Sequence, residues 1–175
     1  MLFRSVRAQL PALLRDQDAE VLLDIPCGDF GWLSQTTLPV SRYIGADIVN
    51  QIVKRNVELY GREFVQFVQR DLCADELPAA DLVLCRDCLV HLSFAHIQQA
   101  IRNLKKSRST WLLTTTFLEC EENIDIATGD WRMLNFERAP FHWSPPTRVL
   151  IEGCTEADGG YADKALGLWR ISELP

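Results

Sequence analysis

The sequence of 175 residues lacks a long apolar run, an excess of basic residues and any internal repeat. No apolar stretch approaches the ~20 residues that a membrane-spanning helix needs. The formal net charge of −6 is opposite in sign to the basic footprint of most nucleic-acid-binding proteins. The one short basic stretch, residues 105–108, falls at the end of a predicted helix, where cations interact favourably with the helix dipole. We therefore expect neither a membrane partner nor a nucleic-acid partner.

The N-terminal residues lack the continuous apolar segment and the small-residue cleavage site of a secretory signal. We therefore expect a cytoplasmic protein, in which the six cysteines are free thiols rather than a disulfide framework. A chain of this length suits one domain with a substantial core, so we expect residues 1–175 to form a single domain.

Motifs of several other enzyme classes are also missing. No G-x-G-x-x-G follows the first predicted strand, which disfavours a nicotinamide-dependent oxidoreductase. No serine lies in a G-x-S-x-G motif, which disfavours a nucleophilic triad. Cys85, Cys88 and His91 are spaced like metal ligands, but no second cysteine pair completes a structural zinc site. We therefore expect no metal.

The clearest signal that is present lies in residues 21–32, VLLDIPCGDFGW. Val21–Asp24 is apolar apart from its final acid, as in a strand that is buried on both faces. The run breaks at Pro26–Gly28, a turn that leads into a predicted helix. Such a turn places backbone N–H groups and a positive helix end at the carboxyl edge of a sheet. In doubly wound α/β folds, ligands bind at that edge.

The rest of the chain alternates predicted strands with predicted helices. Residues 1–20 form a helical segment, which Pro11 splits or restarts. Further strands are predicted at 42–47, 64–69, 81–85, 111–117, 148–154 and 166–172, and helices at 31–38, 48–60 and 93–104. Strands that alternate with helices imply a parallel sheet built from right-handed crossovers.

Residues 119–146 break this alternation, because they are polar, aromatic and proline-bearing. Connections of this length over an α/β sheet are often lids or binding loops. Polar side chains beside aromatic ones suit a small polar substrate, so Asn123, Asp125 and Arg132 are the predicted substrate-binding residues. The alternative is a structural flap over the sheet edge.

The order of these pieces resembles the class I S-adenosylmethionine-dependent methyltransferases over residues 15–175. The family's acid and glycine-bearing turn resemble Asp24–Gly28, and its acid at the end of the second strand resembles Asp47. The acid after the third strand is similar to Asp71. The segment that runs from the fourth strand into a histidine is similar to residues 84–92.

Two positions depart from the family pattern: Pro26 stands where glycine is usual, and Phe30 stands at the motif's last glycine. The stretches DIPCGDF, LCRDCLVHLSF and TTTF further resemble a narrower bacterial branch of the superfamily. The resemblance implies a Rossmann-like, doubly wound α/β fold in three αβα layers. Its sheet is expected to be mostly parallel and seven-stranded, with an antiparallel last strand.

The resemblance also implies that S-adenosylmethionine binds along the carboxyl edge. Asp47 follows Asp24 by about the 20 residues typical of an acid that binds ribose, and its carboxylate accepts both ribose hydroxyl protons. Gly28 permits close backbone approach, since a Cβ would push a ligand away. Asp71 is expected at the adenine, with a cap on the following turn as the alternative. The predicted cofactor-binding residues are Asp24, Pro26, Cys27, Gly28, Asp47, Ile48, Asp71, Leu72 and Arg86.

His91 is the sharpest catalytic candidate. Methyl transfer from a sulfonium is an in-line displacement, so alignment of the reactants supplies most of the acceleration. A hydroxyl or ammonium acceptor must also lose a proton, which histidine accepts readily near neutral pH. Asp87 is the alternative base. The structural alternative for His91 is a side chain that bonds to the backbone and steadies its loop.

These patterns together predict S-adenosylmethionine-dependent methyl transfer to the hydroxyl or amine of a small-molecule acceptor. The alternative is a non-catalytic S-adenosylmethionine-binding module, in which a degenerate methyltransferase fold serves as a partner subunit. The sequence leaves open the identity of the acceptor, the atom that is methylated and the oligomeric state.

Overall fold

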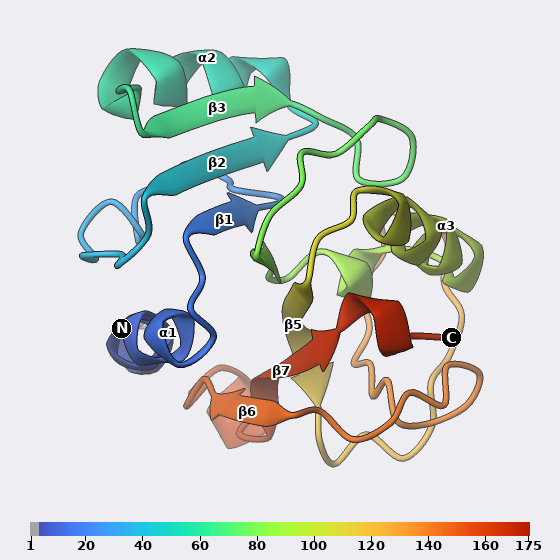
Figure 1. Ribbon diagram of the computed structural model, residues 1–175. Coiled ribbons are helices and arrows are strands. Elements are labelled where there is room, and N and C mark those ends of the chain that lie inside the picture. Colours follow the sequence, from blue (N-terminus) through green and yellow to red (C-terminus); the bar gives the residue numbers. More distant parts are fainter. Residues whose placement is uncertain (1–3) are drawn as a thin grey trace.

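Seven strands form one sheet in residues 4–175, the part of the chain that the computed structural model describes (Figure 1). They are β1 (Val21–Asp24), β2 (Arg42–Asp47), β3 (Val65–Gln69), β4 (Leu82–Cys85), β5 (Trp111–Phe117), β6 (Arg148–Ile151) and β7 (Lys164–Arg170). Their order across the sheet is β3-β2-β1-β4-β5-β7-β6. Neighbouring strands from β3 to β5 are parallel, while β7 is antiparallel to both β5 and β6. The predicted seven-stranded sheet with an antiparallel last strand is confirmed.

The strand order reverses at β1, which lies between β2 and β4. In open α/β sheets, ligands bind outside the carboxyl ends of the strands at such a reversal. The parallel register aligns Asp24 of β1 with Gly45 of β2 and Leu84 of β4. The turns that follow these three strands therefore share one edge of the sheet.

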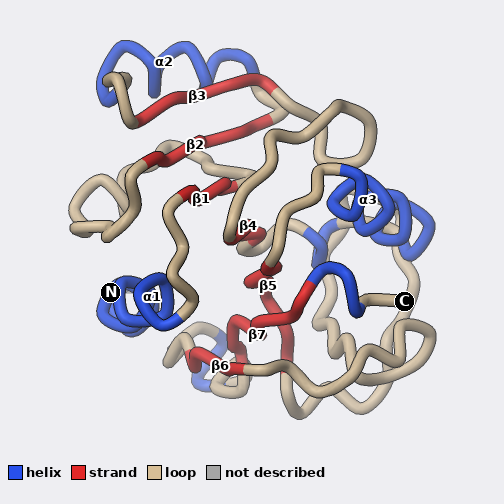
Figure 2. Tube along the Cα trace, in the orientation of Figure 1, coloured by secondary structure: helices blue, strands red, loops and turns tan. Residues whose placement is uncertain are grey.

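Helices cover both faces of the sheet (Figure 2). α1 (Arg4–Asp16) and α2 (Asn50–Tyr60) share a hydrophobic core with one face, and α3 (Phe94–Lys106) packs on the other. Three short 3₁₀ turns complete the regular structure of the described residues: η1 (Leu89–His91), η2 (Ala157–Gly159) and η3 (Ile171–Glu173). The result is the expected three-layer αβα arrangement.

The alternation of side chains along each strand explains the two cores. On β1, Leu22 faces α1 and α2 while Leu23 faces α3, and Leu84 and Val83 of β4 divide in the same way. All four of these side chains are completely buried. Burial on both faces is the reason that these strands read as continuous apolar runs.

α1 runs without interruption through Pro11, so the predicted split at this proline is wrong. A proline inside a helix costs about 3 kcal/mol, because it removes a backbone hydrogen bond and crowds the preceding turn. Packing offsets this cost, since Val6 and Leu10 are completely buried against the sheet and each such side chain contributes roughly 1.5–3 kcal/mol. Residues 2–3, which the helical pattern included, lie outside the described residues.

No helix forms at residues 31–38, where one was predicted, and the chain makes a series of turns instead. The carboxylate of Asp29 accepts a hydrogen bond from the backbone N–H of Gly31 over 2.9 Å. Such local side-chain bonds compete with helical pairing. Arg7 of α1 also donates to the backbone carbonyl of Gln35 over 2.8 Å, which holds the turns against α1.

Residues 119–146, here called the strap, contain neither a helix nor a strand. The strap crosses the carboxyl edge and bonds to two elements there. The backbone N–H of Gly129 donates to the carbonyl of His91 in η1 over 2.9 Å, and that of Phe117, the last residue of β5, donates to the carbonyl of Leu134 over 2.7 Å. The strap therefore lies against the ends of both β4 and β5.

None of the helices in the described residues is long and apolar enough to cross a membrane.

Each of the six cysteines is a free thiol, as predicted. Cys85 is completely buried on β4, whereas Cys88 is half-buried beyond the end of that strand.

Candidate functional site

The turn after β1 folds back against β2. The backbone N–H of Cys27 donates to the carbonyl of Ala46 over 2.8 Å, and burial raises the pKa of the Cys27 thiol. Gly28 has a φ of +52°, a conformation that favours glycine. No heavy atom lies within 4 Å of the position that a Cβ of Gly28 would take. Backbone alone therefore forms the surface of the turn at this point.

Asp47, the last residue of β2, joins this turn directly. Its Oδ2 accepts a hydrogen bond from the N–H of Gly28 over 3.2 Å, and its Oδ1 accepts one from the N–H of Val49 over 2.9 Å. The side chain is 5% exposed. A carboxylate offers about four acceptor positions, so each oxygen can accept one further hydrogen bond, such as one from a ribose hydroxyl.

Asn56 of α2 also holds the turn, and the sequence analysis did not assign it a role. Its Nδ2 donates to the carbonyl of Gly28 over 2.7 Å, and the residue is completely buried. The peptide groups around Gly28 are therefore clamped by Asn56 on one side and Asp47 on the other. A polar residue on the apolar face of a predicted helix was the signal that could have identified it.

Asp24 lies at the end of β1 beneath the turn. It is 2% exposed, and the hydroxyl of Tyr43 donates to its Oδ2 over 2.7 Å. Burial raises the pKa of Asp24 to about 7, against the smaller lowering effects of Tyr43 and the charge of Arg86. The sequence analysis missed Tyr43, because its 19-residue separation from Asp24 carries no motif.

Three more of the predicted cofactor-binding residues follow the ends of β2 and β3. Ile48 is 58% exposed at the carboxyl edge, whereas Leu72 is buried. Asp71 caps the turn that follows it, because its Oδ1 accepts a hydrogen bond from the N–H of Cys73 over 2.8 Å. This is the alternative role considered for Asp71, and it engages only one carboxylate oxygen.

Arg86 and Asp87, which follow β4, belong to a network of four charged side chains. Arg86 donates to Glu152 over 2.6 Å and pairs with Asp87 over 2.9 Å, and Lys164 pairs with Asp87 over 2.8 Å. Burial alone would lower the pKa of Arg86, but the hydrogen bond to Glu152 and the charges of Glu152, Asp87 and Asp24 together raise it. Glu152 and Lys164 are missed by the sequence analysis because they lie 66 and 77 residues from their partners.

His91 ends η1 and is held by the strap. Its Nδ1 lies 2.9 Å from the backbone carbonyl oxygen of Asp130. Because a carbonyl oxygen only accepts, the proton of the neutral imidazole resides on Nδ1 and the lone pair resides on Nε2. The strap thus selects the tautomer in which Nε2 is a base.

The predicted substrate-binding residues form hydrogen bonds mainly with backbone groups of the protein itself. Arg132 donates to the carbonyls of Leu89, Val90 and Leu92 over 2.6–3.0 Å, and burial lowers its pKa to about 10. Asn123 donates to two strap carbonyls, those of residues 135 and 139. Asp125 is exposed, and its Oδ1 accepts from the N–H of Phe94 at the start of α3 over 2.7 Å.

The strap's aromatic residues divide between the core and the surface. Phe136, Phe141 and Trp143 are buried, and the rings of Phe136 and Trp143 stack at 4.1 Å. Trp131 is 43% exposed, and its ring meets that of Tyr161 at 5.2 Å. Much of the strap is therefore a structural flap, and Trp131 is its exposed aromatic side chain at the carboxyl edge.

No family model matches the sequence, and no curated protein matches it. Solved structures match its fold. The methyltransferase domain of bacterial CtHen1-CN aligns with a TM-score of 0.69 at 16% identity, over 97% of this chain and 100% of that one. N-methyltransferase NodS from Bradyrhizobium japonicum WM9 aligns with a TM-score of 0.66 at 15% identity, over 95% of this chain and 94% of that one. Human N-acetylserotonin methyltransferase, in complex with S-adenosylmethionine, aligns with a TM-score of 0.66 at 12% identity, over 94% of this chain and 51% of that one.

At 12–16% identity, these alignments over nearly the whole chain are a likeness of fold. The strand order that reverses at β1 and the antiparallel β7 agree with that likeness. The chain has the Rossmann-like α/β fold of the class I S-adenosylmethionine-dependent methyltransferases.

Proposed function

We propose that the protein binds S-adenosylmethionine along the carboxyl edge and transfers its methyl group to the hydroxyl or amine of a small molecule. The observation that carries this proposal is the position of Asp47 at the end of β2. There, Asp47 is buried and held by two backbone N–H groups, and it keeps acceptor positions for a ribose. Structures with the same fold include methyltransferases in complex with S-adenosylmethionine and with S-adenosylhomocysteine.

The residues of the turn fit this cofactor. The open space beside Gly28 lets a ligand lie against the backbone, and the exposed side chain of Ile48 offers an apolar surface next to Asp47. Arg86 directly follows β4, next to β1, and its charge acts on the buried Asp24 beneath the turn. A charged amino-acid moiety at this point would lie in the field of both groups. When bound, the cofactor supplies an electrophilic methyl group on a sulfonium.

His91 is the proposed general base. Its Nε2 carries the lone pair, because Nδ1 donates to the carbonyl of Asp130. Nε2 would take the proton that a hydroxyl acceptor loses as its oxygen is methylated, or that an ammonium acceptor must lose before its nitrogen can attack. The bond between the sulfonium and the methyl group would break in the transfer, with S-adenosylhomocysteine as the leaving group. Asp87 suits this task less well, because Arg86 and Lys164 both engage its carboxylate. We assign Asp87 to positioning.

Asn123, Asp125 and Arg132 are proposed to act on the acceptor by shaping the strap, since each bonds to backbone groups of the strap or its neighbours. Trp131 and Tyr161 form the exposed aromatic surface beside them. An aromatic surface next to a few polar groups is typical of sites for small polar ligands.

A non-catalytic partner subunit is the second candidate. The observation that favours it is a set of exposed apolar side chains on the strap, Ile124, Trp131 and Met133. Exposed apolar surface of this kind is also typical of protein interfaces. This candidate retains cofactor binding but has no turnover of its own.

The test is calorimetric titration with S-adenosylmethionine and S-adenosylhomocysteine, with NAD as the control. We expect micromolar binding of the first two and none of NAD. A screen of small hydroxyl and amine compounds then follows, with formation of S-adenosylhomocysteine as the readout. Absence of binding would overturn the cofactor assignment. Tight binding without turnover on any compound would favour the partner subunit.

A further inference from the structure

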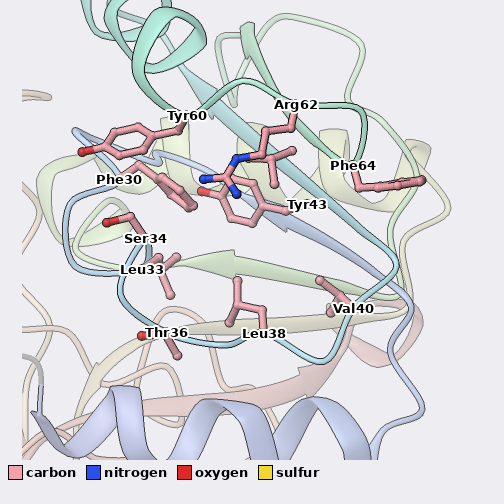
Figure 3. Close-up of a pocket in the computed structure, with 11 residues that line it drawn as sticks. Phe30, Leu33, Ser34, Thr36, Leu38, Val40, Tyr43, Tyr60, Arg62 and Phe64 are labelled. Atoms are coloured by element: carbon pink, nitrogen blue, oxygen red, sulfur yellow. The ribbon is translucent and has the colours of Figure 1, made fainter.

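A cavity lies away from the carboxyl edge. It has a volume of about 340 Å³ and sits at the amino ends of β2 and β3, on the face that carries α2 (Figure 3). Its walls come from three segments: the turns at 30–40, the start of β2 and the connection 60–65 between α2 and β3. The missing helix at 31–38 explains the space, because turns fill less volume on the face of a sheet than a packed helix does.

The floor of this cavity is aromatic. Phe30 and Tyr43 are buried, and their rings meet at 4.7 Å. Tyr60 closes one side, with its ring 5.2 Å from that of Phe30. Leu38 and Val40 form the opposite wall, as Figure 3 shows. A flat apolar group would therefore contact ring faces and aliphatic side chains.

Among the described residues that line the cavity, Arg62 alone has a charged side chain. It extends from the connection after α2 toward the middle of the cavity (Figure 3). Within the described residues, its guanidinium has no hydrogen-bond or ion-pair partner. Arg62 is exposed, so its donors are open to a ligand from solvent. A guanidinium over an aromatic floor suits a planar anion, because its fork of N–H groups matches a carboxylate.

We propose that this cavity binds a small amphipathic carboxylate, with its ring or short alkyl body on Phe30 and Tyr43 and its carboxylate on Arg62. The volume lies at the lower end of the range for small-ligand sites, which is about 300–1,000 Å³. One cation at the rim of an apolar floor matches a ligand with one anionic end. This site is separate from the proposed methyltransferase site and does not depend on it.

The cavity is connected to the turn at the carboxyl edge. Tyr43 lines the cavity and donates its hydroxyl to Asp24 over 2.7 Å. Phe30 contributes its ring to the floor from within the turn itself, and its φ of +58° is unusual for a residue other than glycine. A ligand that presses on either ring therefore alters the support of the turn. By linkage, any change that the carboxylate causes in the affinity of a ligand at the turn is matched by an equal factor in its own affinity.

The binding test is a titration of the protein with 4-phenylbutyrate, followed by backbone-amide NMR, with neutral 4-phenylbutanol as the matched compound. We expect shifts at residues 30–40 and 60–65, and a weaker effect from the alcohol. Arg62→Gln should weaken phenylbutyrate binding at least 5-fold, whereas Arg55→Gln on exposed α2 should leave it unchanged. Leu38→Trp, which fills the cavity, should abolish binding while the protein stays folded.

Two results would overturn the site: no saturable shifts with 4-phenylbutyrate, or equal affinities in the wild type and in Arg62→Gln. The connection between the cavity and the turn at the carboxyl edge has its own test, which rests on the proposed cofactor site. Saturating phenylbutyrate should change the affinity for S-adenosylhomocysteine at least 2-fold. Tyr43→Phe, which removes the bond to Asp24, should abolish that change but keep phenylbutyrate binding. An unchanged affinity in the wild type would overturn the connection and leave the site itself standing.

Discussion

The two sides of the carboxyl edge use their polar side chains in opposite ways. At the turn after β1, the buried side chain of Asp47 accepts two backbone hydrogen bonds and keeps further acceptor positions. In the strap, Arg132 directs its donors to three backbone carbonyls and is buried. In our proposal, the first side presents polar groups to the cofactor, whereas the polar groups of the second side bond to the protein's own backbone.

The difference follows from backbone hydrogen bonding. Strands β1 and β2 satisfy each other's N–H and C=O groups, so side chains at their ends are available for other partners. The strap has no regular structure, yet it lies over buried core residues. Its backbone groups therefore need side-chain partners such as Asn123 and Arg132. Substitutions on the turn side should change ligand binding, and those on the strap side should change stability.

The largest expected effect is a loss of turnover on substitution of His91, which lies between the turn and the strap. His91→Ala should lower turnover by about 10²–10⁴-fold, the usual contribution of a general base. The affinity for S-adenosylhomocysteine should stay the same. Steady-state kinetics on the acceptor from the screen measures the first effect, and calorimetry the second. His96→Ala is the control, because His96 bonds to the strap through Thr128 instead. Near-normal turnover in His91→Ala would leave His91 a structural role.

The next effect is on stability. Arg132→Met should lower the free energy of unfolding by about 3 kcal/mol, because two buried carbonyls and one half-buried carbonyl lose a charged donor. Arg138→Met is the matched control, since Arg138 is an exposed arginine of the same strap and should change stability by less than about 0.5 kcal/mol. Urea unfolding measures both variants. Equal stabilities would contradict the contrast between the two sides.

Asp47→Ala should weaken S-adenosylhomocysteine binding by about 10–100-fold, a loss of roughly 1.4–2.8 kcal/mol. Glu58→Ala, on the exposed face of α2, should have no effect. Isothermal calorimetry gives both affinities. If Asp47→Ala bound the ligand as tightly as the wild type, Asp47 would be removed from the ribose site and the turn side would lose its central group.

The smallest effect is a pH dependence that arises from Asp24. Burial raises the pKa of Asp24 from 3.8 to about 7, so the folded state retains a proton that the unfolded state releases. This contribution to stability is fully present below pH 3.8 and is lost as pH rises through 7. Between pH 6 and pH 8, the ligand-free wild type should lose about 1–2 kcal/mol relative to Asp24→Asn. Urea unfolding at the two pH values checks this, and parallel curves would contradict it.

Local patterns predict much of this fold. The buried runs of β1 and β4 are recognisable because both faces of these strands are covered, and β2 and β5 match their predicted ranges. Asp24, Gly28 and Asp47 were grouped from the motif order, and the structure joins Gly28 to Asp47 by a direct hydrogen bond. The errors fall where a distant contact outweighs local preference. Arg7 and Asp29 stabilise turns in place of a helix at 31–38, and burial against the sheet keeps α1 intact.

The sequence alone was enough to predict an α/β sheet with a polar carboxyl edge. Strands buried on both faces are apolar runs in the sequence, and the acids that end them are visible at fixed positions. Only the tertiary structure decided which polar side chains face that edge. Arg132 and Asn123 are residue types that often bind ligands, but here their side chains donate hydrogen bonds to backbone carbonyls of the protein. Glu152 and Lys164 became partners of Arg86 and Asp87 because the antiparallel β7 returns the chain to the same edge. Such pairings depend on distances in space, which residue spacing along the chain does not encode.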